Sequence, residues 1–142
     1  MKVISIPPDT PAQIVLNRME AFAGGDFGRV WDAYHPDSNF RSAFPDRAAY
    51  VSHAEQNLSK TFRFVEWRVL LEEVGTVARV LLYNVLQLEG TTKAGIEGLE
   101  LALTDEGWRI LATARLEGEN CPVAIETLSW SEFVRLTEGI FF

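Results

Sequence analysis

The first part of the chain carries apolar residues every three or four positions, interrupted by residues that start or stop helices. This spacing predicts three amphipathic helices, over residues 11–23, 27–35 and 47–58. Each range follows a residue whose side chain can cap a helix, namely Thr10, Asp26 and Asp46. Gly24-Gly25 separates the first two helices, and Pro36 ends the second. After the second helix, residues 39–44 are predicted to form a short strand or an extended link.

From residue 61 onward the pattern changes to runs rich in β-branched and aromatic residues, separated by short turns. These runs predict a four-stranded antiparallel meander over residues 62–71, 76–88, 91–103 and 108–116. The second run is apolar at consecutive positions, so both of its faces are expected to be covered, by the chain's own helices and tail or by a second subunit. Ser129 and Glu132 have the spacing of a capping box, which predicts a last helix near residues 130–138. The elements together predict an α+β fold, with N-terminal helices packed on a curved antiparallel sheet and a C-terminal helix added.

Alternation within the first and last strands assigns their side chains to the two faces of the sheet, because successive residues of a strand point to opposite sides. In the first strand, one face is expected to hold Val65, Trp67, Val69 and Leu71. In the last strand, the inward face is expected to hold Trp108, Ile110, Ala112, Ala114 and Leu116. The outward side chains of that strand are then Arg109, Thr113 and Arg115.

Composition and charge narrow the class of protein. With 142 residues, 47% of them hydrophobic, the chain is expected to form one globular domain, with a core over about residues 10–116 and a C-terminal extension over residues 117–142. The net charge of -7 argues against nucleic acid or an anionic membrane surface as a partner, because both select a basic face. Cys121 is the only cysteine, which excludes a disulfide within the chain and a zinc site built from several cysteines. No signal peptide or membrane-spanning run is recognisable, so a cytoplasmic location is expected.

Three segments carry a family resemblance: Phe22-Ala23-Gly24-Gly25-Asp26, Tyr34-His35-Pro36-Asp37 and Asp105-Glu106-Gly107-Trp108-Arg109-Ile110-Leu111. With the helices and the meander around them, residues 10–116 resemble the NTF2-like superfamily. Its cystatin-like α+β fold wraps a curved sheet around helices to form a cone that is open at one end. The stretch from Phe22 to Pro36 is also similar to the YchJ-like branch, which often carries cysteine-rich metal-binding flanks that a chain with Cys121 alone cannot supply.

The resemblance implies a fold more than a function, because NTF2-like proteins include isomerases, dehydratases, epoxide hydrolases, transport factors and binding modules. The steroid-isomerase-like members place an acidic base on the strand that follows the second helix. In this sequence residues 39–44 hold no carboxylate, which argues against that chemistry. An aspartate–arginine–aspartate relay like that of the epoxide hydrolases is not recognisable either.

His35 is the candidate acid–base group, because histidine titrates near neutral pH and this one lies beside Tyr34 at the end of the second helix. The competing interpretation is structural, since a positive charge is favoured at a helix C-terminus. His53 is expected on a solvated helix flank, and Cys121 lacks a neighbouring base that would activate its thiol. No metal site and no cofactor are predicted, because the two histidines lie far apart and have no acidic partner at ligand spacing.

Six aromatic residues are candidates for lining an apolar ligand cavity: Trp31, Tyr34, Phe40, Trp67, Tyr83 and Trp108. Each is also suited to filling the core. Three arginines could recognise an anionic ligand if they face inward, namely Arg41, Arg79 and Arg109. Glu97 and Glu100 are interpreted as solvated strand charges.

These observations predict a non-catalytic NTF2-like homodimer that binds a small apolar ligand or a protein partner. Dimerisation is expected through the open face of the sheet, so Leu82→Arg should disrupt it. The alternative is a small-molecule lyase, isomerase or hydrolase that uses the cone pocket, with His35 as the acid–base group assisted by Tyr34. A third interpretation is an assembly role, in which the apolar segment Ile140-Phe141-Phe142 docks into a partner.

Overall fold

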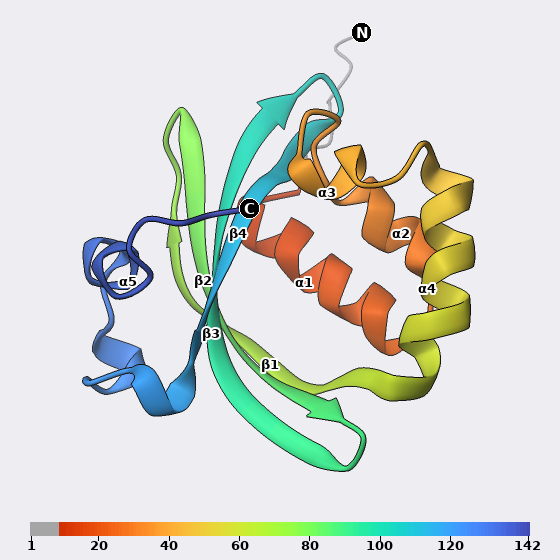
Figure 1. Ribbon diagram of the computed structural model, residues 1–142. Helices are drawn as coiled ribbons and strands as arrows, with labels where there is room; N and C mark the ends of the chain where they lie inside the picture. The colour runs from red at the N-terminus through yellow and green to blue at the C-terminus, as the bar shows by residue number, and fades with distance from the viewer. Residues whose placement is uncertain (1–8) are drawn as a thin grey trace, which may run out of the picture.

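The computed structural model describes residues 9–142, except for the side chains of residues 59–61. Four helices come first along the chain: α1 (Pro11–Ala23), α2 (Phe27–Asp32), α3 (Asn39–Ser42) and α4 (Arg47–Thr61) (Figure 1). The predicted caps of α1, α2 and α4 are confirmed, because Thr10, Asp26 and Asp46 each accept the backbone N–H of the residue three positions on. Gly25 makes the turn between α1 and α2 with a φ of 71°, which residues with a side chain rarely adopt.

The prediction of a strand or extended link over residues 39–44 is wrong, because this segment contains the helix α3. The Ser38 hydroxyl accepts the backbone N–H of Arg41 and so caps the helix. Phe40 and Phe44 both contact the Tyr50 ring, with centroid distances of 4.9 and 5.2 Å. An extended strand would hold these two residues about 13 Å apart, too far for both to reach one ring.

The predicted antiparallel meander is confirmed. β1 (Phe62–Glu73), β2 (Val77–Leu88), β3 (Thr91–Thr104) and β4 (Gly107–Glu117) pair in sequence order, each antiparallel to the next. The sheet curls around α1, and α2 and α4 lie on the side of α1 that faces away from the sheet (Figure 1). Two short 3₁₀ turns, Gly118–Asn120 and Ile125–Thr127, then lead to α5 (Trp130–Leu136), the predicted last helix.

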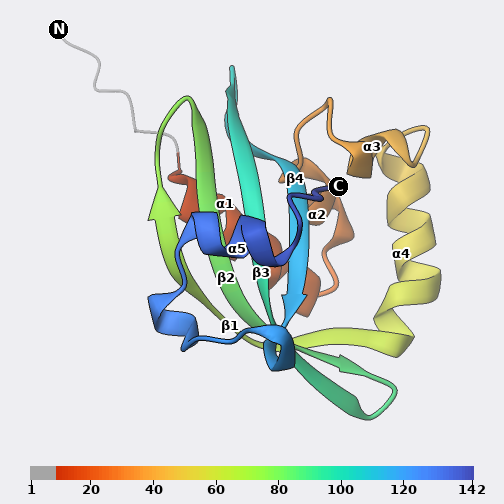
Figure 2. The same cartoon turned by 60° about the vertical axis from the view of Figure 1, so that its left-hand side comes forward.

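The two faces of the sheet carry two separate apolar cores. The inner cluster lies between the sheet and helices α1, α2 and α4, and its sheet residues are Ala78, Val80, Leu82, Leu99, Leu101 and Ile110. The outer cluster lies on the opposite face, where the C-terminal segment covers the strands, and consists of Leu81, Ile96, Ala114, Leu116, Leu128, Trp130 and Phe133. Figure 2 shows α5 lying across the strands on the side away from α1.

This arrangement explains why β2 is apolar at consecutive positions. Leu82 belongs to the inner cluster and Leu81 to the outer cluster, and both side chains are 0% exposed. The chain's own helices and C-terminal segment therefore cover both faces of β2, and its pattern does not require a second subunit. Leu82→Arg would put a charge into the inner core, so it is not a test of an interface on the outer face.

Register shifts correct the predicted assignment of side chains to faces. In β4, Ile110 packs in the inner cluster while Ala114 and Leu116 pack in the outer cluster, so the expected single inward face is wrong. Glu100 pairs with Ala112 and Leu101 with Ile110, so Leu111 is an extra residue and the bulge lies on β4. A one-residue shift moves every later side chain to the other face. In β1, two such shifts place Trp67 and Val69 on the inner side and Leu71 on the outer side.

Backbone groups outside the sheet cover much of the free edge of β4. Ile110 donates its N–H to Ala33 O (2.9 Å) and accepts the N–H of His35 (2.7 Å). Further along the edge, Thr113 and Phe142 exchange two backbone hydrogen bonds of 2.9 and 2.8 Å. These bonds satisfy an edge that would otherwise be open to pairing with another chain. In the described part of the chain, no helix is long and apolar enough to cross a bilayer.

Candidate functional site

A charged side chain lies inside the fold, between α1 and the sheet. Arg18 lies on α1 and is only 2% exposed, so its charge is buried. Its guanidinium donates to both oxygens of Glu97 on β3, at 2.6 and 3.1 Å, and to the Tyr34 hydroxyl at 2.9 Å. This bidentate geometry is the strongest form of an arginine–carboxylate bond. Glu97 is therefore not the solvated charge that the sequence suggested; its side chain is 14% exposed.

The polar contacts continue from Glu97 across the inner face of the sheet. Asn84 on β2 is fully buried, donates to Glu97 Oε1 at 3.5 Å, and accepts from Arg115 on β4. Arg115 was expected to point outward, and the register shift in the β3–β4 pair turns it inward instead. Arg115 also lies 3.3 Å from Glu117, which links the network to a half-buried carboxylate. The result is a row of polar groups that joins α1 to three strands.

The electrostatics of this row favour a structural role. Burial alone would disfavour the charged guanidinium, but the Glu97 carboxylate and the Tyr34 hydroxyl more than offset that cost, so the pKa of Arg18 is raised. Burial also raises the pKa of Tyr34, although Arg18 opposes that shift. Tyr34 is therefore a neutral phenol at physiological pH that accepts a hydrogen bond from Arg18, and its acceptor lone pair is in use.

Most of the predicted aromatic pocket is filled by its own rings. Tyr34 stacks on Phe40 with a centroid distance of 3.8 Å, and Trp31 stacks on Tyr50 at 5.8 Å. Trp67 is half-buried against the same inner cluster. Within the described residues the Tyr50 hydroxyl is buried without a hydrogen-bond partner, so the phenol is held by ring packing alone.

Tyr83 lies away from the other five aromatic candidates. It follows the inner residue Leu82 on β2 and so points to the outer face of the sheet. There the Arg68 guanidinium lies 5.2 Å from its ring centroid, and Arg68 pairs with Glu126 of the C-terminal segment at 2.8 Å. Tyr83 therefore does not share a cavity with Trp31, Tyr34 or Phe40.

The structure separates the two candidate acid–base groups. The Nδ1 atom of His35 accepts the backbone N–H of Asp37 at 2.9 Å, so this nitrogen is occupied by the turn after α2. The Tyr34 side chain points the other way, into the inner cluster, where its hydroxyl bonds to Arg18. His53 packs against Phe44 on the exposed side of α4, with ring centroids 5.3 Å apart. Within residues 9–142, no group of three or more His, Cys, Asp or Glu side chains could hold a metal ion.

A cavity of about 430 Å³ opens between α1, α2 and the β3–β4 turn, and is called the rim cavity below. Its apolar lining comes from Ile14, Ala33 and Trp108, and its uncharged polar lining includes Asn17. Its charged lining consists of Arg29, Arg109, Asp9, Asp32 and Glu106. Of the six aromatic candidates, Trp108 is the one that this cavity reaches.

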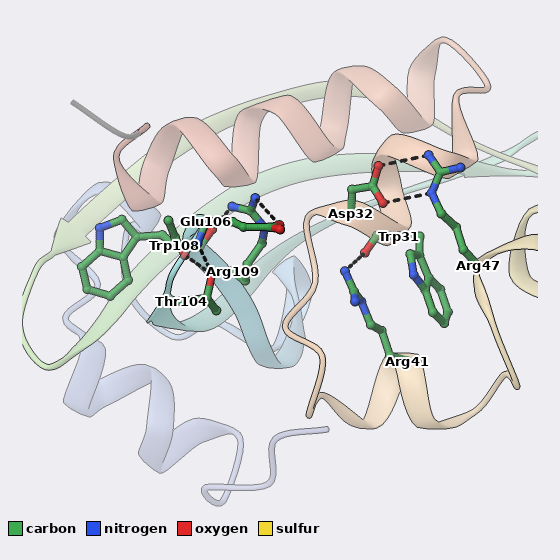
Figure 3. A network of polar contacts seen from close by, with 9 residues as sticks. Trp31, Asp32, Arg41, Arg47, Thr104, Glu106, Trp108 and Arg109 are labelled. Atoms are coloured by element: carbon green, nitrogen blue, oxygen red, sulfur yellow. Dashed lines mark hydrogen bonds and ion pairs between the residues drawn. The ribbon is translucent and has the colours of Figure 1, made fainter. Parts of the chain in front are cut away.

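The charged groups around the rim cavity differ in how fully they are paired. Asp32 on α2 holds Arg47 of α4 in a bidentate pair, with both distances 3.0 Å, and is thereby neutralised. Arg109 on β4 donates to the carbonyl of Trp108 at 2.7 Å and lies 3.8 Å from Glu106, whose side chain is 85% exposed. Figure 3 shows Arg109 and Glu106 on the side of the β3–β4 turn, with Asp32 and Arg47 across from them. Arg109 is therefore less fully neutralised than Asp32.

The architecture is that of the NTF2-like, cystatin-like α+β fold, as the resemblance implied. The sequence matches no protein-family profile and no curated protein. Among solved structures, the chain is similar to a SEC-C motif containing protein from Rhodopseudomonas palustris, with a TM-score of 0.58, 20% identity, and coverage of 74% of this chain and 77% of that one.

Two further solved structures have the same fold. One is a domain of unknown function with a cystatin-like fold from Nostoc punctiforme, with a TM-score of 0.57, 14% identity, and coverage of 89% of this chain and 81% of that one. The other is an NTF2-like protein from Novosphingobium aromaticivorans, with a TM-score of 0.53, 14% identity, and coverage of 84% and 86%. At these identities the likeness establishes the fold alone.

Proposed function

We propose that this protein is a non-catalytic small-molecule-binding domain that holds its ligand in the rim cavity. The observation that carries the proposal is the cavity itself. Its volume of about 430 Å³ falls within the range of small-molecule sites, and its lining combines an aromatic wall with a few polar groups. Trp108 supplies the apolar surface, and Asn17 and Arg109 supply groups that can orient a ligand.

The interior of the cone supports binding at the rim rather than inside. Arg18 and Glu97 neutralise each other where an interior ligand would need free polar groups. The rings of Trp31, Tyr34 and Phe40 pack against one another and against Tyr50. A ligand entering there would have to displace well-packed aromatic contacts, whereas the rim cavity already has room.

The placement of His35 supports binding rather than acid–base catalysis. General acid–base chemistry needs a titratable group within hydrogen-bond reach of the reacting atoms. The Nδ1 atom of His35 is engaged by the backbone of Asp37, and the ring is not among the groups that line the rim cavity. The expected homodimer and the cytoplasmic location stay predictions, and the covered outer face removes the observation that motivated the dimer.

Trp108→Ala tests the proposal. Ligand-observed NMR with indole and indole-3-acetate, two small aromatic probes, should detect saturable binding to the unaltered protein. The substitution should weaken binding about tenfold or more, because it removes the aromatic wall. Leu103→Ala is the matched control, since Leu103 lies opposite Trp108 in the β3–β4 pair but is 60% exposed and outside the rim cavity. If neither probe binds, or if both variants bind as the unaltered protein does, the rim cavity is not the binding site.

A further inference from the structure

Two arginines from different elements line one hollow beside the rim cavity. A second hollow, of about 290 Å³, is lined by Pro36, Arg41, Thr104, Asp105, Glu106 and Arg109. Arg109 and Glu106 line both hollows, so the two spaces adjoin. Figure 3 shows the Arg41 side chain rising from α3 toward Trp31, and the Arg109 side chain beside the β3–β4 turn with its guanidinium turned toward Glu106.

Arg41 is held in place without a counter-charge. Its guanidinium lies over the Trp31 ring, 5.2 Å from the centroid, and its Nη2 atom donates to the Trp31 carbonyl at 3.3 Å. Its Nε atom is buried and has no hydrogen-bond partner within the described residues. No carboxylate of residues 9–142 lies within ion-pair distance of Arg41. Stacking on an indole ring fixes a guanidinium while leaving its edge free to donate.

Arg109 is also largely uncompensated. Its side chain is 19% exposed, and its one carboxylate contact among the described residues is the 3.8 Å approach of Glu106. Because Glu106 is 85% exposed, that contact is weak and screened by solvent. Partial burial, reinforced by the neighbouring Arg109, lowers the pKa of Arg41, while Asp32 and Glu106 oppose the shift. Two cations that line the same hollow repel each other, and an anion bound in that hollow would offset the repulsion.

We propose that Arg41 and Arg109 together bind an oxyanion, a carboxylate or a phosphate, that belongs to the ligand of the rim cavity. This inference rests on the proposed function and adds the chemical class of the ligand: a small molecule with an apolar part against Trp108 and an anionic end between the two arginines. Guanidinium groups suit planar carboxylates and phosphates because they donate two parallel hydrogen bonds. Asp105 and Glu106 also line the hollow, and the oxyanion would replace the weak contact of Glu106 with Arg109.

The experiment follows the Nε–Hε NMR signals of arginine in the full-length protein during titration with sodium phosphate, sodium acetate and, as an ionic-strength control, sodium chloride. We expect saturable shifts of the Arg41 and Arg109 signals with phosphate or acetate and none with chloride. Arg41→Gln and Arg109→Gln should each weaken anion binding about tenfold or more, the usual effect of losing a hydrogen bond to a charged group. Glu106→Gln should tighten binding, because it removes the competing carboxylate.

Arg79→Gln is the matched control, since it removes the same charge from a strand arginine that lies 5.8 Å from the Trp130 ring on the outer face. If Arg79→Gln and Arg109→Gln weakened anion binding equally, the loss would reflect overall charge alone, and the proposed site would be overturned. The site is likewise overturned if phosphate and acetate shift nothing beyond chloride, or if Glu106→Gln binds the anion more weakly. The stronger of the two anions identifies the group on the ligand.

Failure of this site can be distinguished from failure of the proposed function. Trp108→Ala should weaken indole binding as predicted above and change phosphate binding much less, because Trp108 does not line the second hollow. Indole binding without any anion effect would overturn the oxyanion site alone. Anion binding without indole binding would overturn the apolar part of the proposed ligand.

Discussion

At the scale of single residues, the buried pair of Arg18 and Glu97 links the helices to the sheet. These residues are 79 positions apart, and their contact joins α1 to β3. Removing charges from water is costly, so a buried pair is retained only when its geometry is good and its remaining groups are bonded. Here Tyr34 and Asn84 supply additional bonds, although the Arg18 Nε atom is buried without a hydrogen-bond partner among the described residues.

Breaking this pair from one side should destabilise the protein strongly. Glu97→Gln leaves the guanidinium buried without a counter-charge and should lower the free energy of unfolding by about 3–5 kcal/mol. Urea denaturation measures the change, and the double variant Arg18→Met/Glu97→Met should cost less than the sum of its single variants.

The comparison pair for that measurement is Arg135 and Glu132 on α5. It has the same closest distance, 2.6 Å, but the arginine is 66% exposed. Arg135→Met should therefore change the free energy of unfolding far less than Glu97→Gln does. If Glu97→Gln proved no more costly than Arg135→Met, the buried pair would contribute nothing special to stability.

The sequence indicates locally that Arg18 is buried, but it does not indicate that Glu97 is its partner. Arg18 falls within the apolar stripe of α1, beside Val15 and Met19, and a charge at a core position calls for a buried partner. Its partner Glu97, however, stands in an alternating strand like any solvated residue. Long-range pairing of this kind depends on the final packing, so reading the chain locally could not reveal it.

At the scale of elements, helix starts were predictable because capping is a contact within a few residues. Thr10, Asp26, Asp46 and Ser129 all cap as the sequence indicated. Ser38 makes the same contact, but the short helix that it starts has no apolar repeat long enough to identify. The faces of β1 and β4 were not predictable, because bulges depend on pairing with a neighbouring strand and leave the alternating sequence unchanged.

The packing of α5 against the sheet depends on Gly98. A Cβ atom at this position would lie 2.8 Å from Phe133 Cδ1 and closer still to Cε1, so even alanine overlaps the ring. Gly98→Ala should lower the free energy of unfolding by about 1–3 kcal/mol through overpacking. Thermal denaturation measures this effect, and limited proteolysis should show faster cleavage between residues 118 and 129.

Gly75→Ala is the control for Gly98→Ala. Gly75 lies in the exposed β1–β2 turn, where an added Cβ atom meets Val77 O at an ordinary 3.5 Å. This variant should keep the stability of the unaltered protein within about 0.5 kcal/mol. Equal stability of the two alanine variants would show that Phe133 moves aside at no cost.

At the scale of the whole molecule, the protein is a sheet covered by two layers with separate cores. The inner layer includes the rim cavity and the buried polar row, whereas the outer layer is a lid of apolar residues centred on Phe133. The proposed binding site and the apolar cover thus lie on opposite faces of the sheet. Changes in the outer layer should alter stability and association before they alter ligand binding.

Removing residues 118–142 tests this division. The truncated protein should lose several kcal/mol of stability, since truncating a buried phenylalanine alone costs about 3–5 kcal/mol. It should also self-associate, because Leu81, Ile96 and Leu116 would become exposed. Light scattering after size-exclusion chromatography measures the association. Phe142→Ala, whose side chain is 70% exposed, is the control; a monomeric truncated protein of full stability would contradict the role given to the outer layer.

The order of the two layers along the chain also matters while the protein is being made. The inner helices precede the strands that they cover, whereas Phe133 of the outer layer follows Leu81 by about 50 residues. A ribosome adds roughly 5–20 residues per second, so these residues take about 3–10 s to synthesise. During that interval β2 exists without its outer cover. The nascent chain therefore exposes the apolar outer side of β2 for some seconds of every synthesis, before the residues that cover it have been made.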